Sequence, residues 1–74
     1  MEEIKKELEK RISNQISAKC LLSIIRPEEN VEIIELYKHN GFGKNFLEIF
    51  IVMCNELGLT FIVKTDYVLQ IYKG

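Results

Sequence analysis

The chain has 74 residues, of which 47% are hydrophobic and 28% are charged, and its ten basic and eleven acidic side chains give a net charge of −1. A chain of this length forms one small domain, 1–74, and buries only about 60% of its unfolded surface. The apolar content excludes intrinsic disorder. The balanced charge argues against a strongly electrostatic partner such as bulk nucleic acid or an anionic membrane.

The sequence lacks the usual marks of secretion and of membrane insertion. Cys20 and Cys54 lie in separate apolar runs, which favours buried free thiols over a disulfide. Residues 2–11 are highly charged where a signal peptide needs an apolar stretch. No apolar run approaches the ~20 residues of a membrane span. We therefore expect an intracellular, cytoplasmic protein with no membrane partner.

The first predicted element is a helix over residues 2–16. Aliphatic side chains recur at every fourth position, namely Ile4, Leu8, Ile12 and Ile16. The following segment, residues 17–26, is ambiguous. Its leucines favour a continued helix, whereas the dense apolar block from Cys20 to Ile25 favours a short buried strand. We expect a helix, with a strand near residues 20–25 as the alternative.

A further helix is predicted from Pro27 to His39. Proline suits the first helical position, and the glutamates after it suit the positive end of the helix dipole. The buried face would consist of Val31, Ile34 and Tyr37. The solvated acidic face would consist of Glu28, Glu32 and Glu35. The Asn40-Gly41 pair would close this helix.

The predicted helix at residues 45–57 is apolar over most of its circumference. One face carries Phe46, Phe50, Met53 and Leu57. Val52 interrupts the narrow polar stripe on the other side, Asn45 and Glu48 resemble a capping box, and Gly58 suits the helix end. A helix of this kind is normally buried on more than one side. We expect it to form the core, with contact to a partner as the alternative.

The tail from Leu59 to Tyr72 is predicted to form a β-hairpin with a three-residue loop at 64–66. This register places the larger apolar set on one face: Leu59, Phe61, Val63, Tyr67, Leu69 and Ile71. The other face receives Thr60, Ile62, Val68, Gln70 and Tyr72. A slip of one residue would send the apolar set to the wrong face, which favours the three-residue loop.

The predicted fold is therefore α+β, with three helices followed by a C-terminal β-hairpin. This order, with Glu56-Leu57-Gly58-Leu59 leading into the hairpin and Tyr67-Val68-Leu69 starting its second strand, resembles a winged-helix domain. The resemblance implies a DNA-binding transcriptional regulator whose third helix enters the major groove. That helix offers no cation on its exposed stripe. DNA contacts would instead fall to Lys38, His39, Lys44 and Lys64.

No motif in the sequence indicates catalysis or a ligand. Gly41-Phe42-Gly43-Lys44 lacks the spacing and the preceding strand of a phosphate-binding loop. His39 is the only histidine and has no nucleophile adjacent to it in sequence. The glutamates lack a histidine at i+3 and the spacing of an EF-hand. We expect no enzymatic activity, no metal and no cofactor.

The sequence predicts a small protein-binding module, acting as an adaptor, a regulator or an inhibitor. Its hydrophobic surface exceeds what one small core can cover, and such a surplus marks interfaces. The candidate partner-binding residues are Ile62, Val68, Tyr72 and Val52. The partner is a second protein or a second copy of the chain, most simply in a homodimer. A winged-helix DNA-binding regulator is the alternative.

Overall fold

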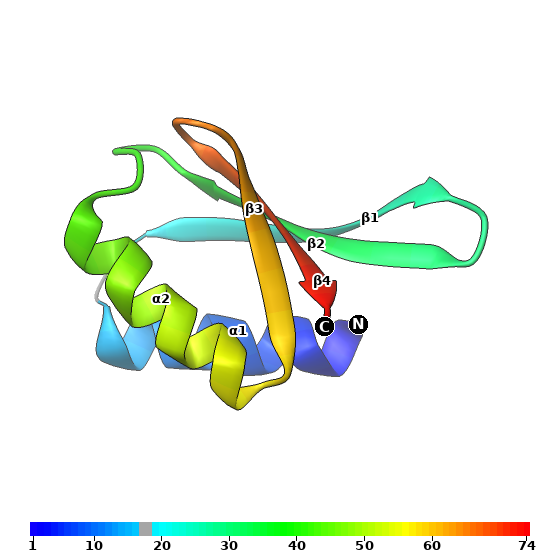
Figure 1. The fold of residues 1–74 in the computed structure, drawn as a ribbon, viewed down its shortest axis with the longest axis horizontal. Coiled ribbons are helices and arrows are strands. Elements are labelled where there is room, and N and C mark those ends of the chain that lie inside the picture. The colour runs from blue at the N-terminus through cyan, green and yellow to red at the C-terminus, as the bar shows by residue number, and fades with distance from the viewer. Residues whose placement is uncertain (17–18) are drawn as a thin grey trace.

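The computed structural model describes residues 1–16 and 19–74, which form two helices and one four-stranded antiparallel sheet (Figure 1). In chain order the elements are α1 (Glu2–Gln15), β1 (Cys20–Glu28), β2 (Val31–Lys38), α2 (Lys44–Glu56), β3 (Leu59–Thr65) and β4 (Val68–Lys73). The strand order is β1-β2-β4-β3. The two hairpins therefore adjoin at β2 and β4, and β1 and β3 form the edges of the sheet.

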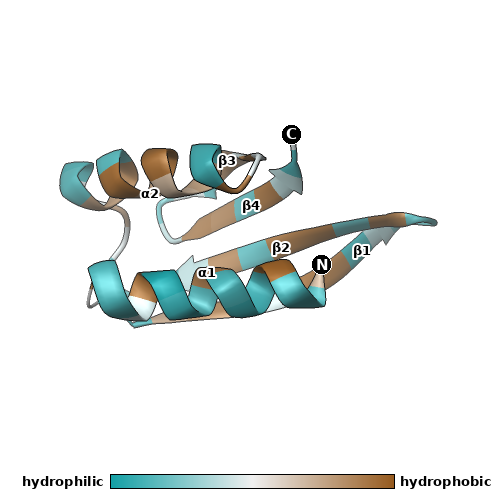
Figure 2. Cartoon of the chain, turned by 90° about the horizontal axis from the view of Figure 1, so that it is seen from below, coloured by the Kyte–Doolittle hydropathy of each residue, from teal (hydrophilic) through white to brown (hydrophobic). Residues whose placement is uncertain are grey.

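Both helices lie on the same side of the sheet and run in opposite directions (Figure 1). α1 lies against β1, and α2 lies against β3. Arg11 joins the helices, because its Nη1 donates a hydrogen bond to Glu56 Oε1 at 3.0 Å. Figure 2, seen from the helix side, shows a mostly hydrophilic outward surface on α1, whereas α2 also exposes hydrophobic residues there.

The core lies between the helices and the sheet. Its buried side chains form one cluster: Leu8, Ile12, Ile34, Leu36, Phe46, Phe50, Met53, Cys54, Leu59, Leu69 and Ile71. Phe50 is fully buried, stacks on Phe46 at 5.5 Å between ring centroids, and meets Phe61 edge-on at 5.1 Å. Such aromatic contacts add to the hydrophobic gain from burial.

The α+β class is confirmed, as are the first helix, the apolar helix and the C-terminal hairpin. Gly58 follows α2 with φ at 68°, a left-handed conformation that suits glycine at a helix end. The predicted capping box at the start of α2 is wrong. Gly43 is the N-cap residue, and no side chain caps the helix there.

The predicted helix from Pro27 to His39 is wrong, since this segment contains the end of β1, a turn and β2. Its β-branched residues favour an extended chain, and strand alternation places Ile34 in the core while Ile33 points to the opposite side of the sheet. Asn30, with φ at 65°, occupies the turn between the two strands. Pro27 lies on an edge strand where the pairing is interrupted between Ile25 and Glu28, a position that tolerates its missing N–H group.

The helix expected over residues 17–26 is also wrong from Cys20 onward, where the alternative of a strand is correct. Residues 17 and 18 lie outside the described part of the chain. β1 pairs with β2 through partners such as Leu22 and Leu36. With two helices in the described residues and the order α-β-β-α-β-β, the resemblance to a winged-helix domain is overturned.

The hairpin differs from its predicted register by two residues. Phe61 pairs with Ile71 rather than Leu69, Asp66 and Tyr67 form the turn, and the pairing shifts between Val63 and Thr65. A shift of two residues preserves which side chains share a face. The predicted division of the hairpin into two faces is therefore correct within both strands, and Tyr67 leaves its face for the turn.

Candidate interaction surface

The side of the sheet opposite the helices carries no covering element among the described residues, and we call it the open face. Side chains alternate along each strand, so the residues between the core positions lie on this face. They are Leu21, Ser23, Ile25, Ile33, Glu35, Tyr37, Thr60, Ile62, Val68, Gln70 and Tyr72.

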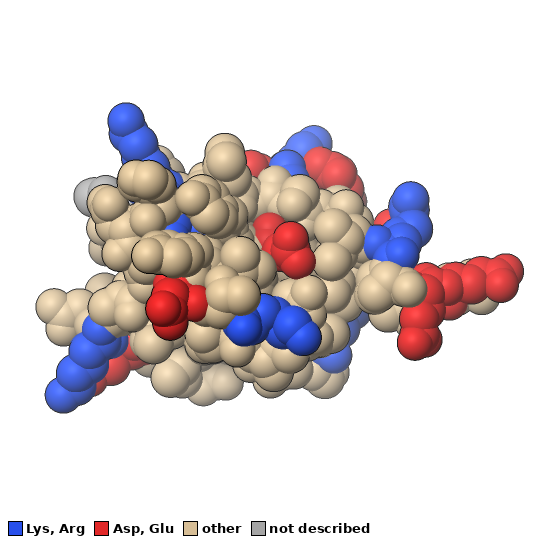
Figure 3. Space-filling model, turned by 90° about the horizontal axis from the view of Figure 1, so that it is seen from above, with Lys and Arg blue, Asp and Glu red and all other residues tan. Residues whose placement is uncertain are grey.

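Apolar side chains form a continuous row across one end of the open face. Leu21 pairs with Tyr37, and Tyr37 pairs with Val68 on β4. Leu21 is 71% exposed and Tyr37 is 41% exposed. Ile62 on the edge strand β3 is 45% exposed but lies in the neighbouring row, since it pairs with Gln70. Figure 3, which looks onto this face, shows a broad uncharged surface with few acidic or basic groups. Exposed apolar surface of this kind marks sites of interaction.

A polar row crosses the middle of the open face and is internally hydrogen-bonded. Gln70 Nε2 donates to Glu35 Oε2 at 3.2 Å, and Tyr72 Oη donates to Gln70 Oε1 at 3.1 Å. Glu35 is the only charged side chain among the eleven residues of this face, all of them in the described part of the chain. The bonds hold these partly buried side chains in place, so the row gives the face fixed hydrogen-bonding groups beside its apolar row.

A hollow of about 260 Å³ lies between the start of β1 and the end of β2. Its lining consists of Lys19, Cys20, Leu21, Tyr37 and His39. The paired side chains of Leu21 and Tyr37 supply apolar walls from the open face, and Lys19 supplies a positive charge beside them. The hollow therefore combines apolar walls with a cation at its border.

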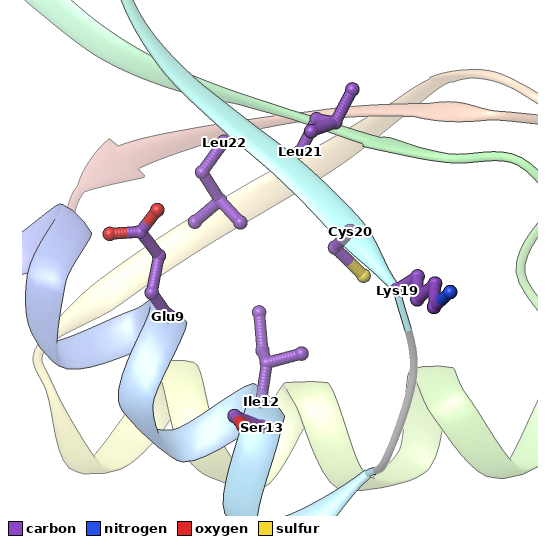
Figure 4. Close-up of a pocket in the computed structure, with 7 residues that line it drawn as sticks. All are labelled: Glu9, Ile12, Ser13, Lys19, Cys20, Leu21 and Leu22. Carbon is purple, nitrogen blue, oxygen red and sulfur yellow. The ribbon is translucent and has the colours of Figure 1, made fainter.

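A second hollow, of about 370 Å³, lies between α1 and β1 on the helix side of the sheet. Figure 4 shows Ile12 of α1 and Leu22 of β1 pointing toward one another across it, with Glu9 at one side. Burial raises the pKa of the Cys20 thiol, and the nearby Lys38 ammonium opposes part of that rise. The thiol is therefore protonated at neutral pH and lines this hollow as an uncharged group.

The described residues show no grouping with evident catalytic chemistry. Burial raises the pKa of the Cys54 thiol to about 12, so this group is also protonated and is a poor nucleophile. Within residues 1–16 and 19–74, no three histidine, cysteine, aspartate or glutamate side chains come together as metal ligands. Neither described helix is long and apolar enough to cross a membrane.

The structure separates the four predicted partner-binding residues into two places. Ile62, Val68 and Tyr72 share the open face. Val52 is 57% exposed on α2, which covers the other side of the sheet. One surface thus contains three of the four residues, and Val52 belongs to the helix side.

The four residues predicted for DNA contact lie near one end of the molecule. Lys38 N donates to Tyr67 O at 2.9 Å, which joins the end of β2 to the turn after Lys64. Lys38 is partly buried; its Nζ donates to Gly41 O at 2.6 Å and lies 5.5 Å from the centroid of the Phe46 ring. Lys38 thus has an evident structural role.

The remaining three basic positions, His39, Lys44 and Lys64, are exposed. Lys44 Nζ lies 3.9 Å from Glu48 Oε1, so a carboxylate accompanies one of these charges. Lys44 is the first residue of α2, and β2 occupies the place of the expected middle helix, so the described elements do not present these residues in the arrangement of a winged helix.

Two prominent residues of the open face, Leu21 and Tyr37, were not predicted as site residues because both were assigned to helices. The signal that could have found them is period-two alternation. Leu21-Ser23-Ile25 in one strand and Ile33-Glu35-Tyr37 in the other alternate with the core residues.

Comparisons with protein-family models, with curated proteins and with solved structures found no match to this chain.

Proposed function

We propose that this chain is a non-enzymatic protein-binding module that contacts its partner through the open face. The observation that carries the proposal is the apolar row of the exposed Leu21 and Tyr37 and the partly exposed Val68, set on a sheet whose other side is filled by the core. A module of this size would act as an adaptor, a regulator or an inhibitor. Burial of the row against apolar surface on a partner would supply the main driving force.

The chemistry of the open face favours a protein over a nucleic acid. Nucleic-acid binding requires cations against the phosphate backbone, and the side chains of the open face include none. Tyrosine is enriched at protein interfaces because it combines a large apolar ring with a hydroxyl group. Tyr37 and Tyr72 provide two such side chains on this face.

The hollow beside Leu21 and Tyr37 suggests how a partner is oriented. Its apolar walls suit one large aliphatic or aromatic side chain, and Lys19 at its border suits an adjacent carboxylate. The preferred partner would therefore present an apolar side chain next to an acidic residue. The acidic group would affect the association rate and the salt dependence more than the affinity.

The two thiols support a cytoplasmic location as part of this proposal. Both Cys20 and Cys54 are free. Free thiols persist in reducing compartments, whereas small secreted domains usually depend on disulfides.

A photo-crosslinking amino acid placed at Tyr37 tests the proposal, with the same amino acid at Ile49 on α2 as the control. The Tyr37 probe should capture a protein in cells that naturally express the chain, and the Ile49 probe should not. The captured protein is then purified, and its affinity is measured by calorimetry. We expect Leu21→Lys to weaken binding by at least about tenfold, because it places a charge in the apolar row, and Val52→Lys to have little effect. Equal affinity for wild type and Leu21→Lys would exclude the open face as the site.

DNA binding is the competing proposal and rests on the basic positions near the loop after β2. It is tested with several fluorescent DNA duplexes of different sequence at low and at physiological salt. Binding through phosphate contacts falls steeply with salt. Tight, salt-sensitive and sequence-dependent binding would favour DNA over a protein partner.

A further inference from the structure

The two edge strands of the sheet, β1 and β3, differ in how they are protected from pairing with a strand of another chain. β1 contains Pro27, its pairing is interrupted between Ile25 and Glu28, and Arg26 adds a charge there. Proline, bulges and charges are the devices that prevent edge strands from associating. β3 contains no proline, and its register shift, between Val63 and Thr65, and its one charge, Lys64, lie at the turn end of the strand. Both edges keep a regular stretch, Cys20 to Ile25 in β1 and Leu59 to Val63 in β3, and β3 differs in having no proline.

β3 exposes an apolar side chain on each side of the sheet, beside the exposed polar residues Thr60, Lys64 and Thr65. Ile62 on the open face is 45% exposed, and Val63 on the helix side is 52% exposed. A groove of about 300 Å³ runs between β3 and α2, where Ile51 is 49% exposed. The strand edge and the neighbouring side of α2 therefore form one mainly apolar strip, in which Asn55 and Thr60 are the polar residues lining the groove.

The sequence of β3 is suited to antiparallel pairing with itself. A two-fold axis at Ile62 places Ile62 opposite its own copy and Phe61 opposite Val63, so that apolar residues meet on both faces. The same register places Lys64 of one copy opposite Thr60 of the other, so the two Lys64 side chains do not face one another. A net charge of −1 adds little repulsion between two copies.

We propose that β3 pairs with β3 of a second copy about a two-fold axis at Ile62, which joins two four-stranded sheets into one of eight strands. The unpaired backbone groups of each edge find partners, and the two Ile51 side chains flank the junction on the helix side. One strand and one side of one helix make a small interface, below about 1,200 Å² in total, so the dimer dissociates in the micromolar range.

This dimer goes beyond the proposed function and is tested on purified protein without any partner. Sedimentation equilibrium of the wild-type chain should show a concentration-dependent dimer. Ile62→Lys and Ile62→Glu should each raise the dissociation constant by at least about tenfold, because each places like charges opposite one another. An equimolar mixture of the two variants should associate again, which also shows that both are folded. Leu21→Lys, on the same face at the other edge, should leave the dimer unchanged.

Disulfide trapping tests the register independently. In antiparallel pairs the Cα atoms of facing residues lie about 4.5 or 5.5 Å apart, within the range that a disulfide spans. Ile62→Cys should therefore crosslink to its own copy under mild oxidation. Thr60→Cys should not, since the two copies of that residue lie roughly 13 Å apart along the strand in this register. Efficient crosslinking through residue 60, association that survives Ile62→Lys, or a wild-type monomer at several hundred micromolar would each overturn the proposal.

Discussion

Replacement of Phe50 by alanine should remove much of the stability of the fold. The Phe50 side chain is surrounded by other core residues and is fully buried, with 0% of its surface exposed to solvent. A buried aromatic side chain withdraws about 150–250 Å² from water, which at about 25 cal/mol per Å² amounts to about 4–6 kcal/mol. Alanine retains part of this burial, whereas the cavity and the lost ring contacts add to the cost. We expect the free energy of unfolding to fall by about 3–5 kcal/mol.

The loss expected for Phe50→Ala is large compared with the total free energy of unfolding. A chain of 74 residues has an unfolding free energy of about 4–11 kcal/mol. Urea denaturation followed by far-ultraviolet circular dichroism measures the change, with Val52→Ala as the control on the same helix. Val52 is 57% exposed, so its replacement should change stability by no more than about 0.5 kcal/mol. A loss below about 1 kcal/mol for Phe50→Ala would refute the assignment of Phe50 to the centre of the core.

Three further predictions concern a backbone conformation, a thiol and DNA. Gly58→Ala should lower stability by about 1 kcal/mol in urea denaturation because φ is 68° there, and an unchanged stability would contradict the strain argument. Burial raises the pKa of Cys54 from 9.0 to about 12, so the folded state favours the neutral thiol. The free energy of unfolding should therefore fall as pH rises from about 9 to about 12, and Cys54→Ala should flatten this part of a plot of stability against pH. At neutral pH Cys54 should react with a thiol reagent more slowly than the half-buried Cys20, and the reverse order would contradict the burial of Cys54. Binding to a DNA duplex should be weak and independent of sequence in a fluorescence anisotropy titration at physiological salt, and nanomolar sequence-specific binding would contradict the proposed function.

Local signals predicted α1, α2 and the last hairpin. α2 was recognisable from the spacing of Phe46 and Phe50 and from Gly58 after its end, features that act within a few residues. In the hairpin, alternation determined which side chains share a face. It did not determine the register, because a shift of two residues keeps the same faces.

The first hairpin was not predicted because its pairing depends on distant residues. The segment from Val31 to Lys38 has apolar residues at both helical and strand spacing, so its own pattern permits either structure. β4 decides the matter, since it pairs with β2 through contacts such as Glu35 with Gln70, which are remote in sequence. The central position of β2 then requires an extended chain.

The candidate site was predicted in part for the same reason. Ile62, Val68 and Tyr72 were identified because their hairpin was identified, and the structure places all three on the open face. Leu21 and Tyr37 complete the apolar row only when β1 and β2 are recognised as strands. The errors in these two secondary-structure elements therefore removed about half of the surface from the prediction.

Hydroxyl-radical footprinting tests the central claim most directly. The chain is compared alone and saturated with the purified protein partner that photo-crosslinking has identified. The method reports the exposure of individual side chains, and Leu21 and Tyr37 are well exposed in the free chain. The proposed function predicts that oxidation of these two side chains falls when the partner binds, while oxidation of Ile49 and Val52 on α2 does not change. Protection of Ile49 and Val52 with no change at Leu21 and Tyr37 would contradict it and would place the partner on the helix side of the molecule.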